Sequence, residues 1–121
     1  NLSNVSTVAS PSDILALQEM AANVQADKQV IDYAVNVVRA TREWQGLSLG
    51  AGPRGSISLI RAARAEALCQ QRDFITPDDI KSVALPVLRH RVALAPEMEL
   101  EGYSTDQILE SVLQSIDAPR Q

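Results

Sequence analysis

Cysteine and histidine each occur once, and this scarcity excludes two kinds of chemistry. Cys69 alone cannot form an internal disulfide, and Cys69 with His90 falls short of the three or four ligands that zinc sites use. No apolar run approaches the length of about 18 residues that a membrane helix needs, and no basic-then-apolar leader opens the chain. We therefore expect no metal site, no membrane span and a cytoplasmic location.

Aromatic residues make up only 3% of the chain, which disfavours a β-sandwich and a surface that stacks nucleic-acid bases. The sequence has 121 residues, of which 45% are hydrophobic and 21% charged, a composition typical of one folded domain. Its isoelectric point near 4.9 argues against a nucleic-acid partner. We predict an all-α fold, a small helical bundle with at most a short strand pair.

Charge is unevenly distributed along the chain. Residues 39–91 hold nine basic and five acidic side chains, whereas the flanking segments hold two basic and ten acidic ones. Nine of the eleven basic residues are arginine, whose planar guanidinium binds phosphate or carboxylate through two parallel hydrogen bonds. The middle of the chain is therefore where an anion-binding site is expected.

Capping signals and apolar spacing predict five to six helices. The expected helices cover about residues 11–22, 28–42, 53–72, 77–86 and 105–116, with Ser104 or Thr105 as the cap of the last. Pro86 is expected to end or kink its helix. We expect a loop over residues 43–52, a short strand at 92–94, and a further loop through the acidic run at 97–101.

Arg54 is the most informative residue, because Pro53 before it marks a helix start. A cation in a first turn opposes the helix dipole, at a cost of about 0.3 to 1 kcal/mol, so its placement invites a reason. Phosphate binding and simple extension into solvent remain equally open from the local sequence. Helical spacing also places Arg54 on a stripe within an arc of about 80°. The stripe comprises Arg54, Arg61, Arg64 and Arg72.

Four segments occur in an order that resembles the C-terminal lid of MoxR-type AAA+ ATPases. They are Ala40-Thr41-Arg42 after Tyr33, the run from Leu49 to Arg54, the run from Arg72 to Ile80, and the run from Val87 to Arg91. The resemblance spans about residues 12 to 94. It implies that residues 1–10 are a polar lead-in from an ATPase core, residues 11–117 the helical lid and residues 118–121 a tail.

The resemblance also implies a function. Arg54 would be the sensor-2 arginine that contacts the γ-phosphate of ATP, with Gly52 and Pro53 adjacent to the nucleotide. Gly52 stands where the family commonly has serine. The parent protein would hydrolyse ATP with Mg²⁺, form rings with copies of itself, and act in chaperone-like remodelling or cofactor insertion, with a von Willebrand A domain protein as a partner.

The chain is expected to hold no nucleotide by itself, because it has no phosphate-binding G-x-x-x-x-G-K-[ST] loop. It also begins with Asn1 rather than Met, which indicates a piece of a longer protein. The alternative is a non-enzymatic interaction domain whose arginine stripe binds an acidic protein.

Three further residues receive more modest expectations. Cys69 is expected to be a buried structural thiol. Arg42 and Arg91 match positions of the family motif. The sequence leaves open whether each faces nucleotide, a neighbouring subunit, or an internal carboxylate such as Asp73 or Asp79.

Overall fold

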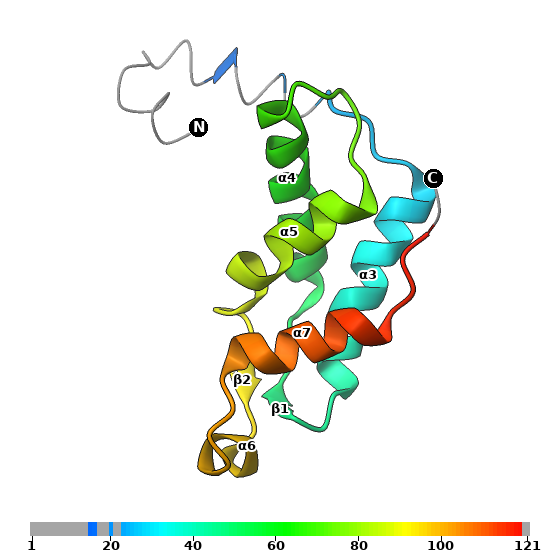
Figure 1. Ribbon diagram of the computed structural model, residues 1–121. Coiled ribbons are helices and arrows are strands. Elements are labelled where there is room, and N and C mark those ends of the chain that lie inside the picture. The colour runs from blue at the N-terminus through cyan, green and yellow to red at the C-terminus, as the bar shows by residue number, and fades with distance from the viewer. Residues whose placement is uncertain (1–14, 17–19, 21–22, 120–121) are drawn as a thin grey trace.

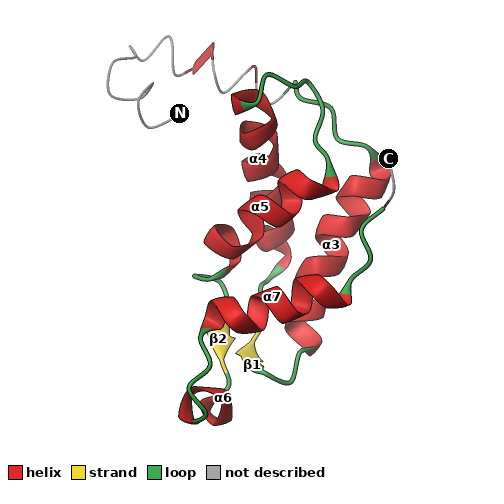
Figure 2. Cartoon of the chain, viewed as in Figure 1, coloured by secondary structure: helices red, strands yellow, loops and turns green. Residues whose placement is uncertain are grey.

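The computed structural model describes residues 15–16, 20 and 23–119. This part of the chain forms a helical bundle with one antiparallel strand pair (Figures 1 and 2), which confirms the predicted fold class. The elements are α3 (Lys28–Glu43), β1 (Leu47–Leu49), α4 (Pro53–Cys69), α5 (Pro77–Leu88), β2 (Ala93–Leu94), α6 (Pro96–Leu100) and α7 (Thr105–Ser115). The helix expected over residues 11–22 lies mostly outside the described residues.

Four helices share one core. α4 packs against α5 and α3, and α7 packs across α3 and α5 (Figure 1). Each helix contributes the apolar side that its spacing predicted, so the core forms where these sides meet. Its fully or almost fully buried side chains include Val30, Tyr33, Val37, Val38, Leu59, Ala63, Ile80, Leu88, Leu109 and Val112. None of the described helices is both long and apolar enough to cross a bilayer.

Two helices begin with reciprocal capping boxes, as their sequences predict. The Thr76 hydroxyl accepts a hydrogen bond from the Asp79 backbone N–H, and the Thr76 N–H donates to the Asp79 carboxylate at 2.8 Å. Ser104 and Gln107 repeat this arrangement at α7, so Ser104 rather than Thr105 is the cap. Each box satisfies donors that would otherwise lack partners at the helix start.

Helix α4 ends at Cys69, three residues before the predicted end. Gln71 adopts a left-handed conformation with φ of 61°, and the Arg72 N–H donates to the Ala67 carbonyl at 2.9 Å. This is the hydrogen bond of a Schellman helix end, built here without the usual glycine. Arg72 therefore leaves the helix, and its inclusion in the arginine stripe was wrong.

Arg72 instead joins the end of α4 to the start of α5. Its two terminal nitrogens donate to the two carboxylate oxygens of Asp79 at 2.6 and 2.8 Å, and one also donates to the Phe74 carbonyl at 3.0 Å. The segment before α3 is attached to the connection between α4 and α5. The Gln25 N–H donates to the Asp73 carbonyl, and the Ile75 N–H donates to the Gln25 carbonyl. The ion pair and the backbone hydrogen bonds of Gln25 thus both act on the α4–α5 connection.

The region predicted as a loop over residues 43–52 contains strand β1. It pairs antiparallel with β2, with Leu47 opposite Leu94 and Leu49 opposite Ala93. The predicted strand at 92–94 is confirmed as β2. Leu47 is buried whereas Leu49 is 62% exposed, so only the first residue of β1 reaches the core. The loop prediction failed because the pairing partner lies more than forty residues away in the sequence.

Two segments that contain proline extend beyond what the sequence suggested. Of the two outcomes expected at Pro86, the helix does not end there: α5 continues to Leu88, and the carbonyl of Ser82 that proline leaves unbonded belongs to an exposed residue and can be solvated. The acidic run forms α6 rather than a loop. Pro96 occupies its first turn with Glu97 and Glu99, whose charges favour a helix N-terminus.

The Arg72–Asp79 pair predicts a specific dependence of stability on pH. Burial raises the pKa of Asp79, but hydrogen bonds from Arg72 and Thr76 outweigh it and hold this pKa below its ordinary value. A carboxyl whose pKa is lower in the folded state than in the unfolded state stabilises the fold at pH values above its unfolded-state pKa. This contribution is lost as the pH falls through the folded-state pKa. Asp79→Asn should therefore cost about 2 kcal/mol at pH 7, and the difference from wild type should shrink below about pH 4.

Urea unfolding of both proteins between pH 7 and pH 3 measures this difference. Asp106→Asn is the matched control, since Asp106 also accepts two hydrogen bonds from an arginine, Arg89, but is 43% exposed. It should cost less than about 1 kcal/mol. Equal costs for the two substitutions at pH 7 would contradict the organising role of the Arg72–Asp79 pair.

Candidate functional site

The candidate site lies at the start of α4, where the structure places the three residues predicted from sequence. Gly52 is the N-cap, Pro53 is the first helical residue, and Arg54 lies in the first turn. Arg54 is exposed, and among the described residues it forms no ion pair. A cation at this helix end is therefore neither neutralised nor buried by the part of the chain that the structure describes.

The loop before Arg54 is fixed to the last turn of α3 by Thr41. The hydroxyl of this fully buried residue accepts a hydrogen bond from the Ala51 N–H at 3.0 Å and donates one to the Val38 carbonyl at 2.6 Å. Sequence analysis missed this role. The signal is that Thr41 continues the buried stripe of α3, where a hydroxyl needs a partner.

Two glycines of this loop have different environments. A Cβ atom on Gly50 would lie 2.4 Å from the Cα atom of Arg42, which is backbone and cannot move aside. A Cβ atom on Gly52 would have no atom within 4 Å. Gly50 thus permits the close approach of the loop to α3, whereas Gly52 could carry a side chain. The open space at Gly52 accommodates the serine of the resembling family.

The other arginines divide into paired and unpaired groups. Arg72 and Arg89 are held by Asp79 and Asp106, respectively. Because Asp79 is taken by Arg72, it is not the partner of Arg42 or Arg91. Arg91 instead donates a hydrogen bond to the Ser58 hydroxyl of α4 at 2.9 Å, a contact that sequence analysis missed because the two residues are 33 positions apart.

The remaining sequence candidates contribute little to this site. Cys69 is exposed, so the expectation of a buried thiol was wrong; α4 ends there and no further turn covers it. His90 is also exposed and forms no ion pair within the described ranges. Over the same residues, no three histidine, cysteine, aspartate or glutamate side chains gather as metal ligands.

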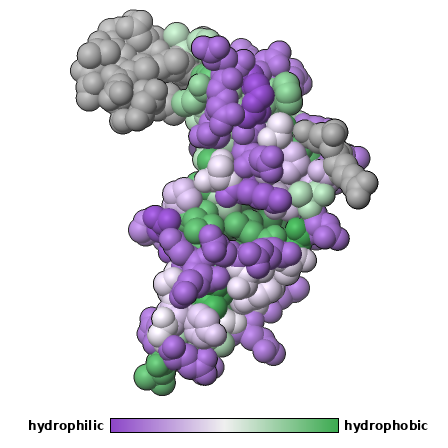
Figure 3. All heavy atoms as spheres, viewed as in Figure 1, coloured by the Kyte–Doolittle hydropathy of each residue, from purple (hydrophilic) through white to green (hydrophobic). Residues whose placement is uncertain are grey.

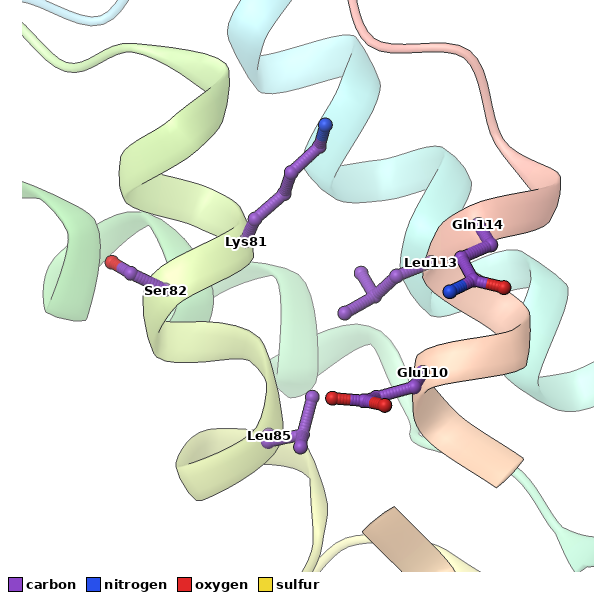
Figure 4. A pocket seen from close by; sticks show the side chains of 6 residues that line it. All are labelled: Lys81, Ser82, Leu85, Glu110, Leu113 and Gln114. Atoms are coloured by element: carbon purple, nitrogen blue, oxygen red, sulfur yellow. The ribbon is translucent and has the colours of Figure 1, made fainter. Parts of the chain in front are cut away.

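A separate open groove of about 370 Å³ lies between α5 and α7. Figure 3 shows a band of apolar surface there, and Figure 4 shows Leu113 and Glu110 of α7 pointing toward α5. Its lining residues are Lys81, Ser82, Leu85, Glu110, Leu113 and Gln114. None of the predicted site residues is among them, so the groove is distinct from the Arg54 site.

Fold and site together define a small helical domain with an exposed arginine at an anchored helix start, where no carboxylate of the described residues pairs with it. The model of the AAA lid domain family matches residues 39–112, which include both the Arg54 loop and helix α5. The chain belongs to the AAA lid domain family, and its similarity to proteins named MoxR groups it with lids of the MoxR type.

Named relatives agree with this assignment. The chain is 39% identical to the uncharacterised protein YeaC of Bacillus subtilis, over 94% of this chain and 36% of that protein. It is 37% identical to Chaperone MoxR1 of Mycobacterium tuberculosis, over 93% of this chain and 32% of the relative. The chain therefore spans about a third of the length of these relatives.

A solved structure shares the fold. It is a protein from Cytophaga hutchinsonii, provisionally described as an ATPase, which superposes with a TM-score of 0.84 at 34% identity. The alignment covers 90% of this chain and 36% of that one. The same bundle thus occurs as one part of a larger molecule.

The contrast between the two glycines gives a matched prediction. Gly50→Ser should destabilise the domain by about 1 to 3 kcal/mol, because its Cβ atom meets backbone. Gly52→Ser should be neutral or stabilise by a few tenths of a kcal/mol, since serine at an N-cap can accept a hydrogen bond from the helix. Thermal unfolding of both variants checks the prediction, and similar melting temperatures for the two would show that the loop does not need its close approach to Arg42.

Proposed function

We propose that this chain is the lid of a longer AAA+ ATPase and that Arg54 is its sensor-2 residue, which binds the γ-phosphate of ATP. The observation that carries the proposal is the exposed Arg54, which has no ion-pair partner among the described residues, at a helix start whose backbone is anchored by Thr41 and Gly50. A fixed backbone limits where the arginine fork can reach, as a phosphate contact requires.

The ATPase core of the same chain would supply what these residues lack. The sequence has no phosphate-binding loop, and the described residues gather no carboxylates that could hold Mg²⁺. They supply cationic donors for phosphate oxygens instead. The relatives are about three times as long as this chain, which leaves room for a core domain that binds nucleotide and metal.

Arg54 would act in two ways at this interface. Its guanidinium would donate two parallel hydrogen bonds to γ-phosphate oxygens and stabilise the charge that develops there during transfer. The same contact would disappear once the phosphate leaves, so the position of the domain would follow the nucleotide state. We further propose that the parent forms rings with copies of itself and remodels client proteins or inserts cofactors, with a von Willebrand A domain protein as a partner.

Substitution of Arg54 in the full-length protein tests the proposal. Arg54→Ala should lower kcat by roughly 100-fold, the loss typical when one donor to a developing anion is removed. ADP affinity should change little, because ADP lacks the γ-phosphate. Arg54→Lys should restore only part of the activity, since an ammonium keeps the charge but loses the fork. Steady-state ATPase kinetics and calorimetry with ADP measure both quantities.

Arg61→Ala is the matched control. Arg61 is exposed on the same helix, seven residues and roughly 10 Å beyond Arg54, so its loss should leave turnover nearly intact. Equal losses in Arg54→Ala and Arg61→Ala would favour the alternative, an interaction domain whose arginines bind an acidic protein.

A second prediction concerns the isolated domain. One arginine at a helix end supplies one or two charge-assisted hydrogen bonds of about 1.5 to 3 kcal/mol each, most of which association entropy offsets. This chain alone should therefore bind ATP no more tightly than about millimolar. A low-micromolar dissociation constant for ATP, measured by calorimetry on this chain alone, would contradict the proposal that the core domain supplies most of the nucleotide contacts.

A further inference from the structure

Arg91 lies beside the face of α4 that carries Arg54. It follows α5 in a turn closed by a hydrogen bond from its N–H to the Leu88 carbonyl at 2.8 Å. Its side chain donates to the Ser58 hydroxyl at 2.9 Å. Ser58 is four residues after Arg54 on α4, which places the two on one helix face, one turn apart. Two arginines from distant parts of the sequence thus meet at this face, Arg54 by its position on the helix and Arg91 by its contact with Ser58.

The guanidinium of Arg91 is held in one orientation by a hydrogen bond, but no carboxylate of the described residues neutralises its charge. Its partner Ser58 is a neutral hydroxyl, and within the described ranges Arg91 forms no ion pair. Arg89, only two residues earlier, is held by two hydrogen bonds to Asp106. In this short segment Arg89 therefore has a carboxylate partner. Arg91 has none among the described residues, and its side chain is directed to the face of α4 that carries Arg54.

Two like charges on one face repel each other, and an anion between them removes that repulsion. Ser58, whose hydroxyl holds Arg91, lies about 6 Å along the helix axis from Arg54. Adjacent phosphate groups can accept from two arginine forks at once. The face is therefore suited to a polyphosphate rather than to a single small anion.

We propose that Arg91 and Arg54 together form a two-arginine clamp for the phosphate groups of a nucleoside triphosphate, with Ser58 as the residue that positions Arg91. The proposal rests on the proposed function, because that function places phosphate at Arg54. It adds a second binding residue, from the segment after α5, so that the relative placement of α4 and α5 becomes part of the nucleotide site.

The test uses the full-length protein and a non-hydrolysable ATP analogue, with dissociation constants measured by calorimetry. Arg91→Ala should weaken analogue binding at least 10-fold, as expected for the loss of a charge-assisted pair. Arg91→Lys should recover part of that affinity. Arg89→Ala is the matched control and should leave the affinity unchanged, since Arg89 is committed to Asp106.

Ser58 provides a test that keeps both charges. Ser58→Ala should weaken analogue binding by about threefold, because Arg91 remains but is no longer oriented. Ser58→Thr keeps the hydroxyl and should restore the wild-type affinity. A purely structural role of Ser58 would lower the melting temperature without changing the dissociation constant, and that result would overturn the positioning assignment.

The outcomes separate this proposal from the sensor-2 assignment. Loss of turnover in Arg54→Ala, with unchanged analogue affinity in Arg91→Ala, would overturn the clamp and leave the sensor intact. Wild-type behaviour of both variants would overturn both proposals. If Arg91→Ala retains analogue affinity but disrupts assembly of the rings, the anion at Arg91 is a carboxylate of a neighbouring copy, and the clamp is wrong.

Discussion

The ion pair between Arg72 and Asp79 fixes the connection between the end of α4 and the start of α5. The carboxylate of Asp79 accepts from the guanidinium of Arg72 and from the N–H of Thr76, so a single buried group completes the exit from α4 and the entry into α5. Because those two helices pack along each other, their connection also determines where the end of α5 meets α4. The contact between Arg91 and Ser58 depends on that placement.

Local signals were sufficient to predict where the four helices of the core begin. Thr76 and Ser104 cap their helices through residues three positions later, and Pro53 fixes the backbone of a first turn by its own ring. The position of Arg54 at a helix start follows from these rules alone. The core faces were equally predictable, because helical spacing decides which side chains of α3 can be buried together.

Features that depend on distant residues could not be predicted in this way. The strand at 92–94 was predicted, but its partner β1 was not, because three residues next to glycines are too short a signal without the distant β2. The end of α4 depends on a left-handed glutamine, Gln71, whereas sequence rules look for glycine. Arg91 matched a family motif, but only the folded chain brings it to Ser58, so its link to the Arg54 face was invisible in the sequence.

The chain enters the domain at the opposite end of α4 from Arg54. Gln25 pairs with Asp73 and Ile75 just beyond the last turn of this helix, whereas Arg54 lies in its first turn (Figure 1). The 17 residues of α4 separate the two points by roughly 25 Å. A rotation of the helix by about 10° about the point where the chain enters would therefore carry the backbone of Arg54, at the other end, through roughly 4 Å. Small rotations at the chain entry are therefore amplified into displacements of Arg54 that exceed the length of a hydrogen bond.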